Sequence, residues 1–167
     1  GVIGGTGSGK STFVSLIARL YDVTSGRILY RGVDEKELKP EFIRGKIGFV
    51  PQKASLFEGS LRDNMKWGKE DATDEEIYQA LDIAQAREFV DQKEQGLDFR
   101  IEQNGGNLSG GQKQRLTIAR ALVRKPEILI LDDSASALDF ATDARLRKAI
   151  KENTDNMTVF LVSQRVS

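Results

Sequence analysis

A glycine-rich stretch close to the start of the chain has the residue types and spacing that bind a polyphosphate. Positions 4–11 spell GGTGSGKS and fit the pattern G-x-x-x-x-G-K-[ST] between an apolar strand and a helix. Glycines let backbone amides turn inward around phosphate oxygens, and the positive end of the following helix faces the same anion. A turn that only caps a helix would not need this whole pattern. The residues expected to hold a nucleotide are Gly4, Gly5, Thr6, Gly7, Ser8, Gly9, Lys10, Ser11 and Thr12.

Three side chains are expected to serve the terminal phosphates and a metal ion. Lys10 would reach the phosphates as a point charge, and the Ser11 hydroxyl would ligate Mg²⁺. Asp132 follows the apolar run at 128–131, so a buried strand would bring its carboxylate to the edge where open α/β sheets bind ligands. We expect Asp132 to hold Mg²⁺ through water. The alternative is that Asp132 only caps the next turn.

Short apolar strands that alternate with amphipathic helices are expected to position these residues. Apolar runs predict strands at residues 47–50, 128–131 and 159–162. The helical spacing directly after the glycine-rich turn predicts an apolar face made of Phe13, Leu16, Ile17 and Leu20. This alternation predicts an α/β fold with a mostly parallel sheet covered on both faces.

The block between Gln52 and Ser109 has a different character. The T-x-x-E pattern at residues 73–76 predicts a capping box at a helix start. The apolar face of that helix is expected to contain Ile77, Ala80, Leu81 and Ala84. A second short helix is predicted over residues 86–92, and no strong strand pattern returns before residue 128. We therefore expect a helical insert on the sheet core.

The composition is that of an ordinary globular domain. Its 25 basic and 25 acidic residues give a formal net charge of zero, which does not suggest binding to nucleic acid or to an acidic membrane. The sequence has no cysteine, so disulfides are excluded, and no histidine, the commonest general base. It has neither a membrane-length apolar run nor a signal peptide. Because both ends fall within apolar strand patterns, we expect a fragment truncated at both ends.

Residues 107–115 spell NLSGGQKQR, which contains the pentapeptide LSGGQ. Ser109 and Gln112 predict a capping box that opens a helix. A bare capping box would not need Gly110 and Gly111, which cost helix stability but offer exposed amides to a phosphate. The stretch resembles the signature of ABC ATPases. That resemblance implies that Ser109, Gly110, Gly111 and Gln112 contact ATP bound on the opposite subunit.

Other segments resemble the same family. Gln52 matches the Q-loop, which touches Mg²⁺ and faces the transport domain. The D-loop, which crosses the dimer interface, is expected at Ser136, Ala137, Leu138 and Asp139. Residues 98–105 lie where exporters have their X-loop. Residues 55–65, SLFEGSLRDNM, resemble a segment of exporter ATPases that DNA-repair and translation relatives lack, although a turn before an amphipathic helix would give a similar pattern.

The resemblance implies a P-loop NTPase (RecA-like) fold. Its parallel-sheet core would comprise residues 1–52 and 126–167, and an inserted ABC helical subdomain would comprise residues 53–125. Two such domains would close head to tail around ATP and Mg²⁺, and closure would move an attached transmembrane domain. The expected partners are therefore a second nucleotide-binding domain and a transmembrane domain in the same parent chain, without nucleic acid. The expected location is the cytoplasmic face of the cell membrane.

Two positions depart from the family pattern at the hydrolytic step. A Glu usually follows the magnesium Asp, but the residue here is Asp133, one methylene shorter. The family's switch histidine is replaced by Gln164. A misplacement of about 1 Å can cost about a hundredfold in rate, and loss of a preorganised donor can cost a similar factor. We expect Asp133, Gln52 and Gln164 to form a slow site in a heterodimer whose partner carries Glu and His, the alternative being neutral drift.

Other functional classes remain as alternatives. A non-transport ABC protein that clamps nucleic acid or the ribosome is disfavoured by the zero net charge and by residues 55–65. A regulatory sensor that binds ATP with little turnover is compatible with Asp133 and Gln164. A simple phosphate-binding kinase fold does not explain LSGGQ.

Overall fold

The computed structural model describes residues 1–134, 136–154 and 156–164. The expected core segment 126–167 is described only in part, because residues 135, 155 and 165–167 lie outside the described residues. The strands are β1 Val2–Ile3, β2 Leu29–Tyr30, β3 Val33–Asp34, β4 Ile47–Val50, β5 Gly59–Ser60, β6 Arg100–Ile101, β7 Ile128–Asp132 and β8 Thr158–Ser163. The helices are α1 Lys10–Ile17, α2 Pro40–Lys46, α3 Leu61–Lys66, α4 Asp74–Ile83, α5 Arg87–Asp91, α6 Gly110–Leu122 and α7 Phe140–Asn153. Short 3-10 turns span Glu35–Glu37, Gly96–Asp98 and Gln103–Gly105.

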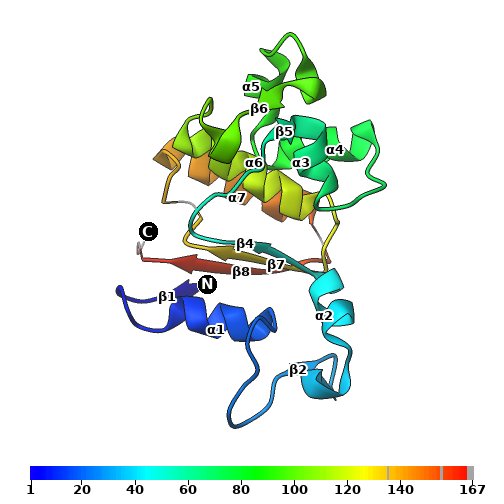
Figure 1. Ribbon diagram of the computed structural model, residues 1–167. Coiled ribbons are helices and arrows are strands. Elements are labelled where there is room, and N and C mark those ends of the chain that lie inside the picture. The colour runs from blue at the N-terminus through cyan, green and yellow to red at the C-terminus, as the bar shows by residue number, and fades with distance from the viewer. Residues whose placement is uncertain (135, 155, 165–167) are drawn as a thin grey trace.

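A parallel sheet with strand order β1-β8-β7-β4 divides the molecule into layers (Figure 1). α1 covers one face of this sheet, and α6 and α7 cover the other (Figure 1). Successive strand residues point to opposite faces. Accordingly Ile130 packs with Val14 of α1, whereas Leu129 and Leu131 belong to the apolar cluster on the α6 and α7 side. The predicted α/β fold with a parallel sheet covered on both faces is confirmed.

The carboxyl ends of these parallel strands meet at one edge of the sheet. The glycine-rich loop follows β1, and Gln52 follows β4. Asp132 ends β7, and Gln164 directly follows β8. Segments that are far apart in the sequence therefore deliver their polar side chains to the same edge, as expected for a ligand site in an open α/β sheet.

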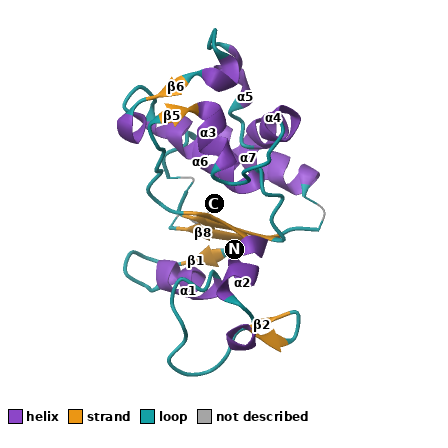
Figure 2. Cartoon of the chain, turned by 45° about the vertical axis from the view of Figure 1, so that its right-hand side comes forward, coloured by secondary structure: helices purple, strands orange, loops and turns teal. Residues whose placement is uncertain are grey.

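The helical block formed by α3, α4, α5 and α6 (Figure 2) shares one apolar cluster with α7 and with the face of the sheet that α6 and α7 cover. Its fully buried side chains include Leu61, Met65, Ile77, Leu81, Ile101 and Leu116. The predicted capping box of α4 forms, with the Glu76 amide donating to Thr73 Oγ1 at 3.3 Å. The predicted apolar face of α4 is buried throughout, at Ile77, Ala80, Leu81 and Ala84.

A short antiparallel pair, β5 with β6, adds to this block and was not predicted from the sequence. Gly59 lies opposite Ile101, and Ser60 lies opposite Arg100. Strands of two residues are too short to show alternation between apolar and polar positions, so the sequence carries no signal for them. The pair joins the segment before α3 to the segment that leads toward α6.

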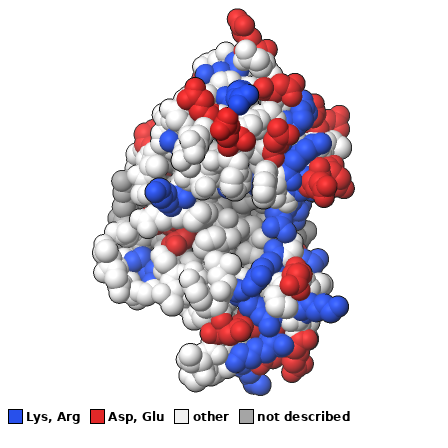
Figure 3. Space-filling model, in the orientation of Figure 1, with Lys and Arg blue, Asp and Glu red and all other residues white. Residues whose placement is uncertain are grey.

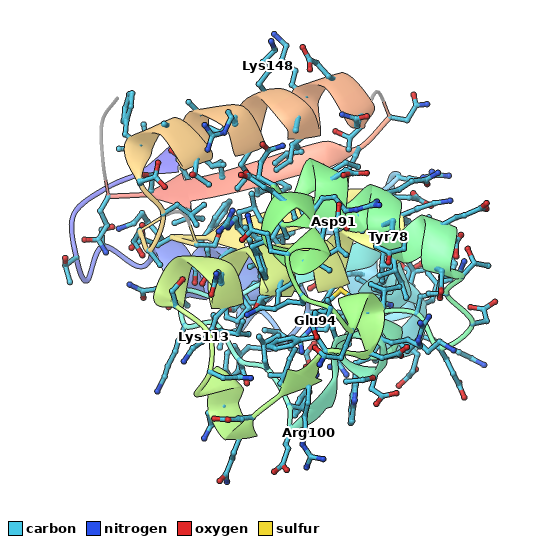
Figure 4. The ribbon with its side chains drawn as sticks, turned by 90° about the horizontal axis from the view of Figure 1, so that it is seen from above. Tyr78, Asp91, Glu94, Arg100, Lys113 and Lys148 are labelled. Carbon is cyan, nitrogen blue, oxygen red and sulfur yellow. The ribbon has the colours of Figure 1, made fainter. Side chains whose placement is uncertain are left out.

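The predicted short helix over residues 86–92 is present as α5. Arg87 anchors it in two directions, because its guanidinium lies 3.9 Å from the centre of the Tyr78 ring and its Nε donates to Asp91 at 2.8 Å. Figure 4 shows Tyr78 and Asp91 on adjoining helices of this block. α5 is thus fixed against α4 by a cation–π contact as well as by the burial of Phe89.

The predicted apolar face of the first helix is wrong at two positions. Phe13 and Leu20 are 48% and 47% exposed, and α1 ends at Ile17, before Leu20. The side chains that bury against the sheet are Val14 and Ala18, at 0% and 3% exposure. A helix this short has apolar residues on more than one side, so spacing alone could not choose the face. Packing against β7 and β8 decides it.

Two carboxylates tie distant segments together and have a pKa lowered to about 2. The Lys69 ammonium, 2.6 Å from Glu76, is the main cause for Glu76, and Lys125 adds to it. For Glu127 the main cause is Lys46 at 2.8 Å, followed by the Tyr30 hydroxyl at 2.5 Å. Glu127 thereby fastens the β2–β3 hairpin to the start of β7.

These ion pairs predict a loss of stability in acid. Because the pKa of each folded carboxyl lies below its ordinary value of 4.5, the stabilisation is complete above pH 4.5 and is lost as pH falls toward about 2. We expect the free energy of unfolding, measured by urea titration at each pH, to decline through that window. The double variant Glu76→Gln, Glu127→Gln should show a shallower decline, and an equal slope in both proteins would contradict this assignment.

Candidate functional site

The glycine-rich loop between β1 and α1 wraps around the ammonium group of Lys10. Lys10 Nζ donates to the carbonyl oxygens of Gly4 at 2.7 Å and Gly5 at 2.6 Å, and to Ser8 Oγ at 3.2 Å. Gly7 and Gly9 have φ angles of +78° and +86°, which side chains rarely tolerate, so the sharp turns of the loop require glycine. The loop therefore forms a compact ring with a positive charge inside it.

The first turn of α1 lacks the side-chain cap that the other long helices have. Its N-cap is Gly9, which offers no side-chain acceptor, and its first turn contains no acidic residue. In contrast the three longer helices α4, α6 and α7 begin with the capping side chains Thr73, Ser109 and Asp139, whereas the shorter helices α2 and α5 have no side-chain cap either. The free amides at the start of α1 are those that a phosphate oxygen can satisfy.

The side chains predicted to hold a metal ion lie beside this loop. Ser11 Oγ donates to Asp132 Oδ1 at 3.1 Å, and Asp132 is only 7% exposed. Within the described residues, no cluster of three or more Asp or Glu side chains could hold a metal by itself. Mg²⁺ does not need such a cluster, since it commonly takes one carboxylate together with waters and substrate phosphates. The oxygen donors of Ser11, Asp132 and Gln52 fit that coordination.

The three residues predicted to be catalytic meet at one carboxylate oxygen. Gln52 Nε2 donates to Asp133 Oδ2 at 3.2 Å, and Gln164 Nε2 donates to the same oxygen at 3.1 Å. The amide of Asp133 donates to the Val162 carbonyl at 3.1 Å, which fixes the turn after β7. Asp133 has a φ of +47°, a conformation in which Asp is enriched among non-glycine residues.

One contact at this site was not predicted from the sequence. The Thr6 hydroxyl of the glycine-rich loop donates to Gln164 Oε1 at 3.1 Å. Thr6 was expected only to contact nucleotide, because the loop pattern accepts any residue at that position. No local signal links two residues 158 positions apart.

A cavity of about 260 Å³ brings most of these side chains together. It is lined by Thr6, Gly7, Ser8, Gly9, Lys10, Ser11, Thr12, Gln52, Asp132, Asp133, Val162 and Gln164. A larger groove of about 870 Å³ lies between α4, α7 and the turn before β7, but none of the predicted site residues lines it. The smaller cavity is therefore the candidate functional site, because the predicted site residues line it.

The predicted signature residues lie away from this cavity. They begin α6, on the face of the sheet opposite α1 (Figure 1). The predicted capping box forms, because the Gln112 amide donates to Ser109 Oγ at 3.2 Å and the Ser109 amide donates to Gln112 Oε1 at 3.0 Å. Space around Gly110 is open, with no atom within 4 Å of where a Cβ would stand. The start of α6 therefore presents exposed backbone.

The predicted D-loop residues connect the two regions. The Ser136 amide donates to the Asp133 carbonyl at 3.2 Å, and the Ala137 carbonyl lies 3.4 Å from where a Cβ on Gly111 would stand. Leu138 is 6% exposed. Asp139 caps α7 by accepting from the Thr142 amide at 2.9 Å, and this contact with Thr142 lowers the pKa of its carboxyl.

Comparison with known proteins identifies the chain. A family model described as ABC transporter matches residues 1–136. The chain belongs to the ABC transporter family. An ABC transporter ATP-binding protein of Bacillus subtilis, YfiB, is 48% identical over 169 residues, which cover 99% of this chain and 29% of that protein. ABC transporter B family member 21 of Arabidopsis thaliana is 45% identical over 166 residues, which cover 99% of this chain and 13% of that protein.

A solved structure gives the same result for the fold. A bacterial Atm1-family ABC exporter with ATP bound superimposes with a TM-score of 0.93 at 34% identity, covering 98% of this chain and 29% of that one. The recognition of an ABC transporter nucleotide-binding domain, and of its fold class, is therefore confirmed. The chain spans less than a third of the length of these relatives. Among the described residues, no helix combines the length and apolarity needed to cross a membrane.

Proposed function

We propose that this ABC transporter chain binds Mg-ATP and serves as the ATPase domain of a membrane exporter, closing head to tail with a second such domain to drive transport. The observation that carries the proposal is the cavity in which the Lys10 ammonium, the Ser11–Asp132 pair and the uncapped start of α1 lie together. The similarity to an exporter with ATP bound supports it.

Some of the residues around the cavity would bind the nucleotide, and others would bind the metal ion. The loop from Gly4 to Thr12 would hold the phosphates of ATP through its amides and Lys10. Ser11, Gln52 and Asp132 would hold Mg²⁺, which supplies positive charge next to the terminal phosphates when it is bound. This assignment uses the chain's own donor and acceptor groups without rearranging the sheet edge.

The signature supports a head-to-tail partner. Gly110 and Gly111 begin α6 on the opposite face of the sheet from α1, Gly110 is exposed, and none of the signature residues lines the phosphate cavity. Amides placed this way suit the phosphates of a nucleotide held by another subunit. The D-loop segment from Ser136 to Asp139 lies between the signature and Asp133, so we propose that it contacts the same partner.

We propose that hydrolysis at this chain's own site is slow. Both Asp133, in the place of the usual Glu, and Gln164, in the place of the usual His, line the cavity together with Gln52. The short carboxylate and the amide would polarise an attacking water less effectively than Glu and His. A catalytically complete partner would then complement this site, so we favour a heterodimer over a homodimer.

The surface for the transmembrane domain is proposed at the stacked pair of Phe57 and Trp67. These rings lie 4.7 Å apart at 27° and are 44% and 70% exposed. The Arg120 guanidinium lies 5.5 Å from the centre of the Phe57 ring and makes a cation–π contact with it. Phe57 belongs to the segment that resembles exporter ATPases, and exposed aromatic pairs are typical anchors of protein interfaces.

The same proposal implies a place and a mode of action. The chain would lie at the cytoplasmic face of the cell membrane, with residues 53–125 acting as a helical subdomain on the core formed by 1–52 and 126–167. Basic and acidic side chains lie next to one another on the face shown in Figure 3. This mixed charge, with a formal net charge of zero, favours a protein partner over nucleic acid.

Equilibrium binding of ATP tests the proposal. We expect the full-length protein to bind ATP in the presence of Mg²⁺, and Lys10→Met to weaken binding about 30-fold, the effect of losing a charged hydrogen-bonding group. Lys148→Met is the matched control, because the Lys148 side chain on α7 is 74% exposed and does not line the candidate nucleotide cavity (Figure 4). Equal affinity in all three proteins would exclude this cavity as the nucleotide site.

A nucleotide sensor remains the second candidate. It is favoured by the same Asp133 and Gln164 that predict slow hydrolysis. Retention of ATP without phosphate release, even with every candidate partner present, would support the sensor over the exporter ATPase.

A further inference from the structure

The Gln164 side chain is held at both of its polar ends. Thr6 Oγ1 donates to Oε1 at 3.1 Å, while Nε2 donates to Asp133 Oδ2 at 3.1 Å. The amide therefore joins the phosphate loop, which follows β1, to the end of β7. All three side chains line the same cavity as Lys10.

These two contacts select one orientation of the amide. The oxygen and nitrogen ends of Gln have nearly the same shape but opposite polarity, so only their partners distinguish them. An ionised carboxylate only accepts hydrogen bonds, so Nε2 must face Asp133. The Thr6 hydroxyl satisfies the other end by donating to Oε1. Nε2 carries two hydrogens and Asp133 takes one of them, which leaves the other for an acceptor in the cavity.

We propose that Thr6 is a positioning residue that, through Gln164, makes this site prefer a nucleoside triphosphate over a diphosphate. The inference rests on the proposed function, because it takes the cavity as the nucleotide site. The amide lies among the groups expected to meet the end of the phosphate chain, next to the carboxylate of Asp133. The Gln164 amide, held between the Asp133 carboxylate and a third phosphate, would donate to both and so offset the repulsion between these two negative groups. A diphosphate has no third phosphate, so its affinity would gain less from this contact.

The test compares two substitutions at one position. Thr6→Val removes the hydroxyl and keeps the shape of the side chain, whereas Thr6→Ser keeps the hydroxyl. We expect Thr6→Val to weaken binding of a non-hydrolysable ATP analogue with Mg²⁺ about 5-fold, as expected for the loss of one net hydrogen bond, and to weaken ADP binding by a clearly smaller factor. Thr6→Ser should restore the affinity of the natural protein. Binding is measured on the full-length protein by titration calorimetry, so no turnover is needed.

A double-mutant cycle with Gln164→Ala separates an indirect role from a direct one. If Thr6 acts through Gln164, the double variant Thr6→Val, Gln164→Ala should bind the triphosphate analogue no more weakly than Gln164→Ala alone. Additive losses, or an equal loss of ADP affinity in Thr6→Val, would overturn the inference, because either result means that Thr6 acts on the nucleotide directly. Failure of the natural protein to bind either nucleotide would instead overturn the proposed function.

Discussion

Replacing Asp133 with Glu and Gln164 with His in the same protein is expected to raise steady-state phosphate release about 100-fold at saturating Mg-ATP. The longer carboxylate would extend toward the attacking water, and the imidazole would add a donor that can carry positive charge. Both side chains already lie at the correct edge of the sheet, where Gln52 and Gln164 meet Asp133 Oδ2. The double variant therefore lengthens the carboxylate at position 133 and adds a donor that can carry positive charge at position 164, without moving the backbone.

The single variants and a stability measurement make this result interpretable. Asp133→Glu should supply most of the gain, because the general base acts on the water directly. Asp133 has a φ of +47°, a backbone conformation that Glu adopts less readily than Asp. We therefore expect a modest loss in the free energy of unfolding alongside the gain in rate. Urea titration of each variant separates the two effects.

The opposite outcome would be equally informative. If the natural protein alone releases phosphate as fast as the double variant, the slow-site proposal is wrong and a self-sufficient homodimer is favoured. If it holds ATP and releases little phosphate until a partner with Glu and His is added, the heterodimer is favoured.

Replacing Gly68 with Ala is expected to destabilise the protein by about 3 kcal/mol, the upper range for forcing extra volume into a packed contact. A Cβ on Gly68 would stand 2.2 Å from the Arg120 carbonyl oxygen and 2.8 Å from Val123 Cγ1. The first of these atoms is backbone of α6, which cannot move without disturbing the helix. The end of α3 and the end of α6 therefore approach each other so closely that only glycine fits.

Gly45→Ala is the matched control for Gly68→Ala. Gly45 lies in α2 with no atom within 4 Å of its Cβ position, so the added methyl group meets nothing. Since Ala favours a helix over Gly, stability should be unchanged or rise by up to about 1 kcal/mol. The free energy of unfolding from urea titration measures both variants. Equal effects at the two glycines would show that α3 and α6 are not closely packed.

The elements that the sequence predicted well rest on local patterns. The glycine-rich loop, the capping boxes at Thr73 and Ser109, and the strands that became β4, β7 and β8 each follow from residues close together in the chain. Asp132 was placed correctly because a parallel sheet brings the carboxyl ends of its strands to one edge. Such patterns fix which element forms and where it begins.

The sequence by itself thus determined the α/β class, the glycine-rich loop, the family and the two unusual residues Asp133 and Gln164. Only the tertiary structure decided which side of α1 is buried, which aromatic side chains stay exposed, and that Thr6 contacts Gln164. The physical reason is that these outcomes depend on distances between segments, and the partners can be 158 positions apart. Periodicity within a segment carries no information on such distances.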